Sequence, residues 1–88
     1  MYFIAVYDIA SPKRLTKMLK LMRQYLNHVQ NSVFDGELTP AALAELKYAA
    51  TEIMNEAEDS LIIYTVGQQK WLGRETIGIE KHSVSNFL

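Results

Sequence analysis

The chain has 88 residues, of which 22% are charged, and its formal net charge is −1. A chain of this length forms one small domain, and without cysteine it can build neither a disulfide nor a zinc–thiolate site. No stretch approaches the roughly 20 apolar residues of a membrane span, and the N-terminal apolar run ends at Asp8 with no basic segment before it. We therefore expect a cytoplasmic globular protein that does not contact membranes.

The first part of the chain predicts a strand followed by a helix. Residues 2–9 are mostly aromatic or branched, too few for a helix, and apolar on both faces, which indicates a strand covered from both sides. Ser11 is a good N-cap with Pro12 at the first helical position, so we expect a helix over residues 12–27. Its core face should consist of Leu15, Met18, Leu19, Met22, Tyr25 and Leu26.

The middle of the chain predicts a hairpin and a second helix. Residues 29–34 indicate a second strand, and Asp35-Gly36 after it is a strong signal for a two-residue hairpin turn. The return strand would be only residues 37–38, because Thr39-Pro40 predicts the start of the second helix. The expected core face of that helix is Leu43, Leu46, Ala50, Ile53 and Met54.

The last part predicts a polar loop at residues 55–59, a strand at 60–66 that is again apolar on both faces, a loop at 68–74 and a short strand at 75–80. This order is that of an α+β, ferredoxin-like βαββαβ sandwich with an extra C-terminal strand. Two helices cover only one face of such a sheet, so a second copy of the chain is the simplest cover for the other face. We predict a homodimer whose domain spans residues 1–80, with the tail 81–88 at the dimer or partner interface.

Asp8 is the only acid in the first 34 residues, and it ends an apolar strand, where a charge needs a partner. In one interpretation it caps the loop before the first helix, accepting backbone N–H bonds around Ala10 and Ser11. In the other it binds metal. One carboxylate is a poor site for Mg²⁺, but two Asp8 side chains related by a twofold axis could share an ion that polarises a phosphate or activates water.

Charge is segregated along the chain. The segment 9–34 contains basic side chains and no acid, whereas the segment 35–59 is strongly acidic. The basic residues of the first helix are Lys13, Arg14, Lys17, Lys20 and Arg23. Such a helix suits a phosphate backbone, although an ordinary solvated face remains an alternative. His28, where this helix meets the next strand, could contact phosphate or cap the helix C-terminus.

Four segments share a pattern with a known family: Tyr7-Asp8-Ile9, Val29-Gln30-Asn31-Ser32-Val33-Phe34, Glu37-Leu38-Thr39 and Asp59-Ser60-Leu61-Ile62-Ile63-Tyr64. Over residues 2–66 the chain resembles the CRISPR-associated Cas2 family of small adaptation nucleases. The resemblance implies a ferredoxin-like homodimer with a metal site formed by the first-strand aspartate of both subunits, which falls on Asp8, beside Tyr7.

The resemblance also implies which residues contact nucleic acid. Basic residues that relatives place after the aspartate correspond to Lys13, Arg14 and Lys17. Ser32 and Phe34 match the family's second-strand motif. Relatives often have an arginine where this chain has His28, so a fixed phosphate clamp is less expected there at neutral pH. Together with the basic helix, the expected nucleic-acid-binding residues are Lys13, Arg14, Lys17, Lys20, His28 and Phe34.

Two functional hypotheses follow. In the first, the homodimer is a Mg²⁺-dependent endonuclease that cleaves RNA or DNA phosphodiesters, with Asp8 and Tyr7 as catalytic residues, and takes part in spacer acquisition with a CRISPR integrase subunit. In the second, it is a non-catalytic scaffold that holds duplex DNA on its basic helices and docks the integrase through its tail. One carboxylate per chain is sparse for a nuclease, which makes the scaffold a physically reasonable alternative.

Overall fold

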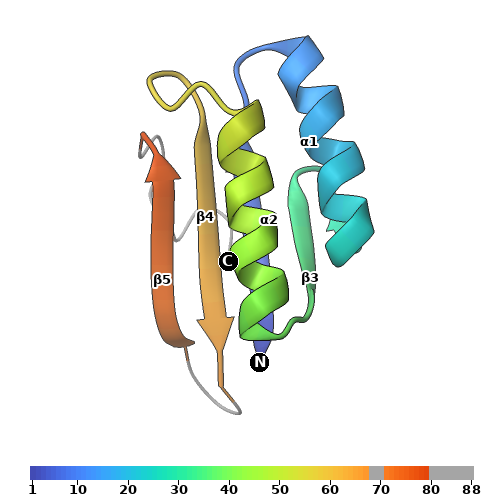
Figure 1. The fold of residues 1–88 in the computed structure, drawn as a ribbon, viewed down its shortest axis with the longest axis vertical. Coiled ribbons are helices and arrows are strands. Elements are labelled where there is room, and N and C mark those ends of the chain that lie inside the picture. Colours follow the sequence, from blue (N-terminus) through green and yellow to red (C-terminus); the bar gives the residue numbers. More distant parts are fainter. Residues whose placement is uncertain (68–70, 80–88) are drawn as a thin grey trace.

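The computed structural model describes residues 1–67 and 71–79, which form one sheet with two helices on the same side (Figure 1). The strands are β1 (Tyr2–Asp8), β2 (Asn27–Gln30), β3 (Val33–Glu37), β4 (Ser60–Val66) and β5 (Trp71–Gly78), and the helices are α1 (Pro12–Tyr25) and α2 (Pro40–Ile53). The strand order is β2-β3-β1-β4-β5, and every neighbouring pair is antiparallel. The predicted ferredoxin-like arrangement with an extra strand is confirmed.

Local side-chain chemistry starts both helices where the sequence predicts. The Ser11 hydroxyl accepts a hydrogen bond from the Arg14 N–H at 3.4 Å, and the Thr39 hydroxyl accepts one from the Ala42 N–H at 3.1 Å. A proline follows each cap, where its missing N–H costs nothing. Helix α1 ends at Tyr25, slightly earlier than expected, because the chain turns into the extended strand β2 at once.

The predicted hairpin turn at Asp35-Gly36 is wrong. Both residues lie inside β3, and the connection between β2 and β3 is made by Asn31 and Ser32. Asn31 has a φ of 45°, a left-handed conformation that asparagine tolerates. Gly36 instead permits a close approach, since a Cβ at this position would lie 3.1 Å from Cδ2 of Leu26. The Asp-Gly pair therefore marks tight packing rather than a turn.

The main core lies between the sheet and the two helices. Phe3, Ala5 and Tyr7 of β1 pack there with buried side chains of both helices and of β3 and β4. These include Met18, Met22, Leu46, Ala50, Phe34, Leu61 and Ile63. The predicted core residue Leu15 is wrong, because it is 40% exposed. The last strand is longer than predicted and begins at Trp71 instead of residue 75.

The opposite face of the sheet carries a second apolar cluster. Val6, Ile62 and Tyr64 are 2–3% exposed there, and the partly buried Ile4 and Val33 pack against them. No helix among residues 1–67 and 71–79 covers this face, as predicted. However, the three central side chains are already enclosed within a single chain, so a second copy is not required to bury them. The predicted interface tail, residues 81–88, lies outside the described residues. Within residues 1–67 and 71–79, no helix is long and apolar enough to cross a membrane.

Candidate active site and nucleic-acid interface

Asp8 lies at the end of β1 on the helix-free face of the sheet. Its register partner is Ser60 of β4, just as Val6, two residues earlier, pairs with Ile62. Because side chains two apart in a strand share a face, Asp8 extends the cluster of Val6, Ile62 and Tyr64 toward the C-terminal end of the central strand β1. The Asp8 side chain is only partly buried, whereas Ser60 is 4% exposed. A carboxylate is thus presented at the margin of an apolar surface.

Tyr7 points the other way. It is 4% exposed and belongs to the main core under the helices, where its ring stacks on that of Phe34 with centroids 6.0 Å apart. Burial raises the pKa of the Tyr7 hydroxyl, while a hydrogen bond with Ser32 and the nearby charge of Arg23 lower it less strongly. The structure therefore does not bring the two predicted catalytic residues, Tyr7 and Asp8, together. They lie on opposite faces of one strand.

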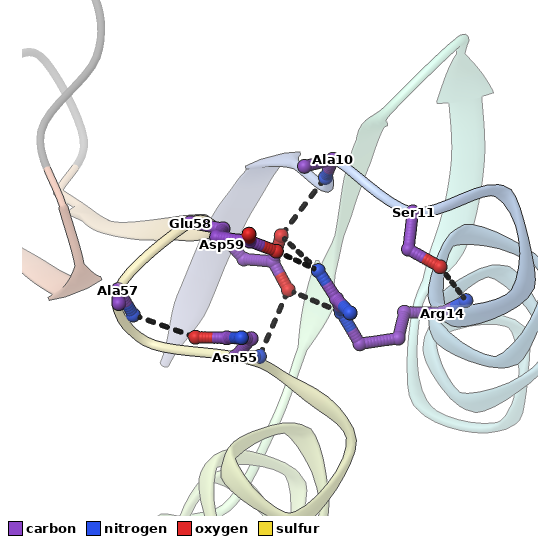
Figure 2. Close-up of polar contacts among 7 residues, drawn as sticks. All are labelled: Ala10, Ser11, Arg14, Asn55, Ala57, Glu58 and Asp59. Atoms are coloured by element: carbon purple, nitrogen blue, oxygen red, sulfur yellow. Dashed lines mark hydrogen bonds and ion pairs between the residues drawn. The ribbon is translucent and has the colours of Figure 1, made fainter.

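A buried carboxylate that the sequence reading did not single out lies next to this strand end. Asp59 is 0% exposed and joins three segments of the chain (Figure 2). It accepts hydrogen bonds from the Ala10 N–H at 2.8 Å and the Asn55 N–H at 2.9 Å. The Arg14 guanidinium also donates to it, at 2.8 Å from Nε and 3.2 Å from Nη2. The Ala10 N–H, expected to be available to Asp8 as a cap, is thus bound by Asp59.

The charge of Asp59 is strongly favoured in the folded protein. Burial alone would raise its pKa, but the hydrogen bonds from Arg14, Ala10 and Asn55 outweigh this and lower the pKa from 3.8 to about 2. The same contact, opposed by burial, raises the pKa of Arg14, and Glu58 adds a second ion pair at 2.9 Å. Arg14, an expected nucleic-acid contact, is therefore held by two carboxylates at the base of α1. Asp59 follows Glu56 and Glu58 in an acidic segment, so the only local signal for it was its position directly before the apolar strand β4.

The other basic residues of α1 form an exposed stripe. Lys13, Lys17, Lys20 and Arg23 recur at intervals of three and four residues, and all are exposed. The opposite side of the helix carries Met18, Leu21 and Met22, which are buried against the sheet. The basic stripe therefore faces away from the sheet, on the side opposite to Asp8. One chain places these two predicted components of a nuclease site on different surfaces.

His28 and Phe34 lie together in the β2–β3 hairpin. Their rings are stacked with centroids 4.5 Å apart and planes only 8° from parallel. Phe34 is 0% exposed and belongs to the core, whereas His28 is exposed above it. Both residues were predicted to contact nucleic acid, but of this pair only His28 is exposed at the surface.

Metal-ligand chemistry within a single chain is limited. Residues 1–67 and 71–79 contain no group of three or more His, Asp or Glu side chains that could hold a metal ion. Mg²⁺ is commonly held by one or two carboxylates with water completing an octahedron. Within the part of the chain that the structure describes, Asp8 is therefore not part of a metal-binding cluster.

Comparison with known proteins places this geometry in a family. The sequence pattern described as "CRISPR associated protein Cas2" matches residues 1–73. The chain belongs to the Cas2 family. It is 46% identical over 81 residues to a "CRISPR-associated endoribonuclease Cas2" of Thermotoga maritima, covering 92% of each chain, and 40% identical over the full length of both chains to that of Methanosarcina acetivorans. The crystal structure of Streptococcus pyogenes Cas2 matches with a TM-score of 0.72 and 36% identity, covering 78% of this chain and 89% of that one.

Membership in the Cas2 family agrees with the resemblance read from the sequence. The matched residues 1–73 include Asp8, the basic stripe and the β2–β3 hairpin. The family match thus extends over every candidate site described above, which lets each be considered as part of a Cas2 protein.

Proposed function

We propose that this Cas2 protein acts as a homodimeric, Mg²⁺-dependent phosphodiesterase on RNA or DNA, and works with a CRISPR integrase subunit in spacer acquisition in the cytoplasm. The observation that carries the catalytic part is the position of Asp8, a partly buried carboxylate beside the apolar helix-free face. Partly exposed Ile4 and Val33 continue that face to the surface, so a second copy packing there could bring two Asp8 side chains together. Relatives named endoribonuclease support the same assignment.

The roles of the residues follow from their chemistry. Two Asp8 carboxylates would hold the ion, and Mg²⁺ when bound would supply charge to polarise a phosphate or acidify a water molecule. Asp59 and Arg14 fix the loop that leaves β1 two residues after Asp8, through the Ala10 N–H. Tyr7 faces the core and is given no chemical step.

A second candidate is the non-catalytic scaffold, in which the dimer holds duplex DNA on α1 and docks the integrase. It is favoured by one observation, the separation of the basic stripe from Asp8 by the sheet. Nucleic acid bound along Lys13, Lys17 and Lys20 would not lie against the carboxylate of the same chain. Binding and cleavage can therefore be tested as separate properties.

The catalytic proposal is tested by Asp8→Asn, which preserves shape and removes the charge. We expect Mg²⁺-dependent cleavage of RNA and DNA to be lost while duplex binding and the dimer seen by light scattering persist. Asp35→Asn is the matched control, an acid on the same face opposite Ile4, and it should cleave normally. Undiminished cleavage by Asp8→Asn would rule out the metal site. If the wild-type protein binds duplex without cleaving RNA or DNA, the endonuclease function would be excluded and the scaffold function supported.

The binding surface is tested by changing Lys13, Lys17 and Lys20 to Glu. Removing three phosphate contacts should lower the slope of log Kd against log salt by about 2–3 and weaken duplex binding at least about tenfold. Lys47→Glu is the matched control, because it reverses one lysine on α2 outside the stripe, where Lys47 pairs with Glu75 at 3.1 Å. Equal losses in the control and the stripe variant would show that the effect is general rather than local.

A further inference from the structure

The β2–β3 hairpin presents an ordered aromatic ring at the surface. His28 lies opposite Phe34 in the strand register, with parallel rings and centroids 4.5 Å apart. One face of the His28 ring covers the fully buried Phe34, and the residue itself is exposed. The pairing register shifts between His28 and Gln30, an irregularity of the kind that redirects side chains near functional sites.

The ring is also fixed in rotation. Nε2 of His28 lies 2.7 Å from the carbonyl oxygen of Asn31. Since a carbonyl oxygen only accepts, Nε2 carries the hydrogen and donates it. The ring therefore has both its plane and its orientation set before any ligand arrives, which reduces the entropy lost when another flat group stacks on it.

Basic charge lies beside this ring. Helix α1 ends at Tyr25, only three positions before His28, and Arg23 is exposed in its last turn. Arg23 is close enough to Tyr7 to lower the pKa of that hydroxyl, and Tyr7 stacks on Phe34, the ring beneath His28. His28 thus follows directly on the end of α1, where the basic stripe ends with Arg23.

We propose that the outer face of His28 is a stacking platform for one unpaired nucleobase of a single strand whose phosphates follow the basic stripe of α1. The proposal rests on the proposed function, because it takes nucleic acid as the ligand. Base faces are accessible in single strands and buried in duplexes, so the platform favours single-stranded RNA or DNA. Phosphate contact is a weaker role for His28, since Nε2 already donates to the carbonyl oxygen of Asn31.

The experiment measures fluorescence anisotropy of a labelled single-stranded oligonucleotide without divalent metal, so that no cleavage occurs. Loss of one stacked base weakens binding by about 5- to 150-fold, which is the effect expected for His28→Ala. His28→Phe keeps a flat ring and should bind within about threefold of wild type. Asn27→Ala is the matched control, an exposed neighbour on β2 whose register with Asp35 puts it on the other face, and it should not change binding.

A second probe needs no protein variant. An oligonucleotide of the same length with abasic positions at its centre should bind wild type about as weakly as the intact probe binds His28→Ala. Equal affinity of wild type for both probes would overturn the platform, as would full affinity in His28→Ala. A loss in His28→Phe that His28→Lys restores would also overturn it and assign a phosphate contact. The lysine-to-glutamate variant of the basic stripe distinguishes the proposed nucleic-acid binding from the His28 platform. If this variant loses binding and His28→Ala does not, the protein binds nucleic acid but the platform is wrong. If the wild-type protein binds no nucleic acid, both proposals are wrong.

Discussion

Removing the charge of Asp59 should destabilise the protein strongly, because this carboxylate is fully buried. Asp59→Asn keeps the size of the side chain but takes a negative charge away from the Arg14 guanidinium. One oxygen can still accept from the Ala10 N–H at the present 2.8 Å position. The new amide group, however, would face two donors, Arg14 and the Asn55 N–H, so that some of these buried groups lose their acceptor.

The magnitude follows from the pKa of Asp59. A decrease from 3.8 to about 2 in the folded protein means that the charged carboxylate stabilises the fold. At ~1.4 kcal/mol per pKa unit this amounts to about 2–3 kcal/mol at neutral pH. Breaking a buried ion pair by removing one partner costs about 3–5 kcal/mol, and Arg14 here is 24% exposed, so we expect a loss of about 3 kcal/mol. In a chain of this size that lowers Tm by about 12–24 °C.

The assay is urea unfolding of both proteins at one fixed concentration, repeated from pH 7 to pH 2. Because the folded-state pKa of Asp59 is depressed, its stabilisation is present above the unfolded value of 3.8 and is lost as the pH falls toward 2. The difference between wild type and Asp59→Asn should therefore be largest near pH 7 and shrink below pH 4. Glu58→Gln is the matched control, since Glu58 also binds Arg14 at 2.9 Å but is 57% exposed, and it should cost under about 1 kcal/mol. Equal stability losses in the two variants, or a difference independent of pH, would refute the reasoning.

Two further predictions concern the strand ends around this site. Tyr7→Phe should lower the free energy of unfolding by about 1 kcal/mol, because the hydrogen bond to Ser32 is lost. It should leave kcat within about twofold of wild type, because Tyr7 faces the core. A loss of cleavage as complete as that of Asp8→Asn would contradict the structural role given to Tyr7. Gly78→Ala should cost at least about 2 kcal/mol in thermal or urea unfolding, because Gly78 has a φ of 89° and a Cβ there would overlap the carbonyl oxygen of Asp59. Gly73→Ala is its control: among the described residues its new Cβ would meet Thr65 Oγ1 at 4.0 Å and nothing nearer, so it should stay within about 1 kcal/mol of wild type.

The sequence was most informative where structure depends on neighbouring residues. Ser11-Pro12 and Thr39-Pro40 start helices because each cap needs only a hydroxyl and an N–H three residues away. The predicted turn at Asp35-Gly36 was wrong because the glycine instead leaves room for the side chain of Leu26, a residue outside strand β3. Packing between elements decides such cases, and no short window of sequence contains it.

The site shows the same division. The two-residue period of β1 was sufficient to place Tyr7 and Asp8 on opposite faces. They were nevertheless predicted to act together, because they are adjacent in the chain and match a dipeptide of the family. The Arg14–Asp59 contact joins residues 45 apart in sequence, so it arises only once β4 pairs with β1. The basic stripe was correctly expected from spacing, but the loss of Arg14 from it depends on this long-range carboxylate.

In a single chain the sheet lies between the basic stripe, proposed to bind nucleic acid, and Asp8, proposed to bind the metal, and this separation constrains both functional hypotheses. The basic stripe and Asp8 are held apart by β1 and by the core that includes Met18 and Met22. A strand cut at Asp8 must therefore be positioned by groups on the helix-free face or by the second subunit, and α1 can contribute affinity without touching the reacting phosphate. It follows that reversing the lysines should reduce binding without reducing turnover of bound substrate, whereas Asp8→Asn should do the opposite. A common loss of both properties in either variant would mean that the two surfaces are joined in the assembled protein in a way that one chain does not allow.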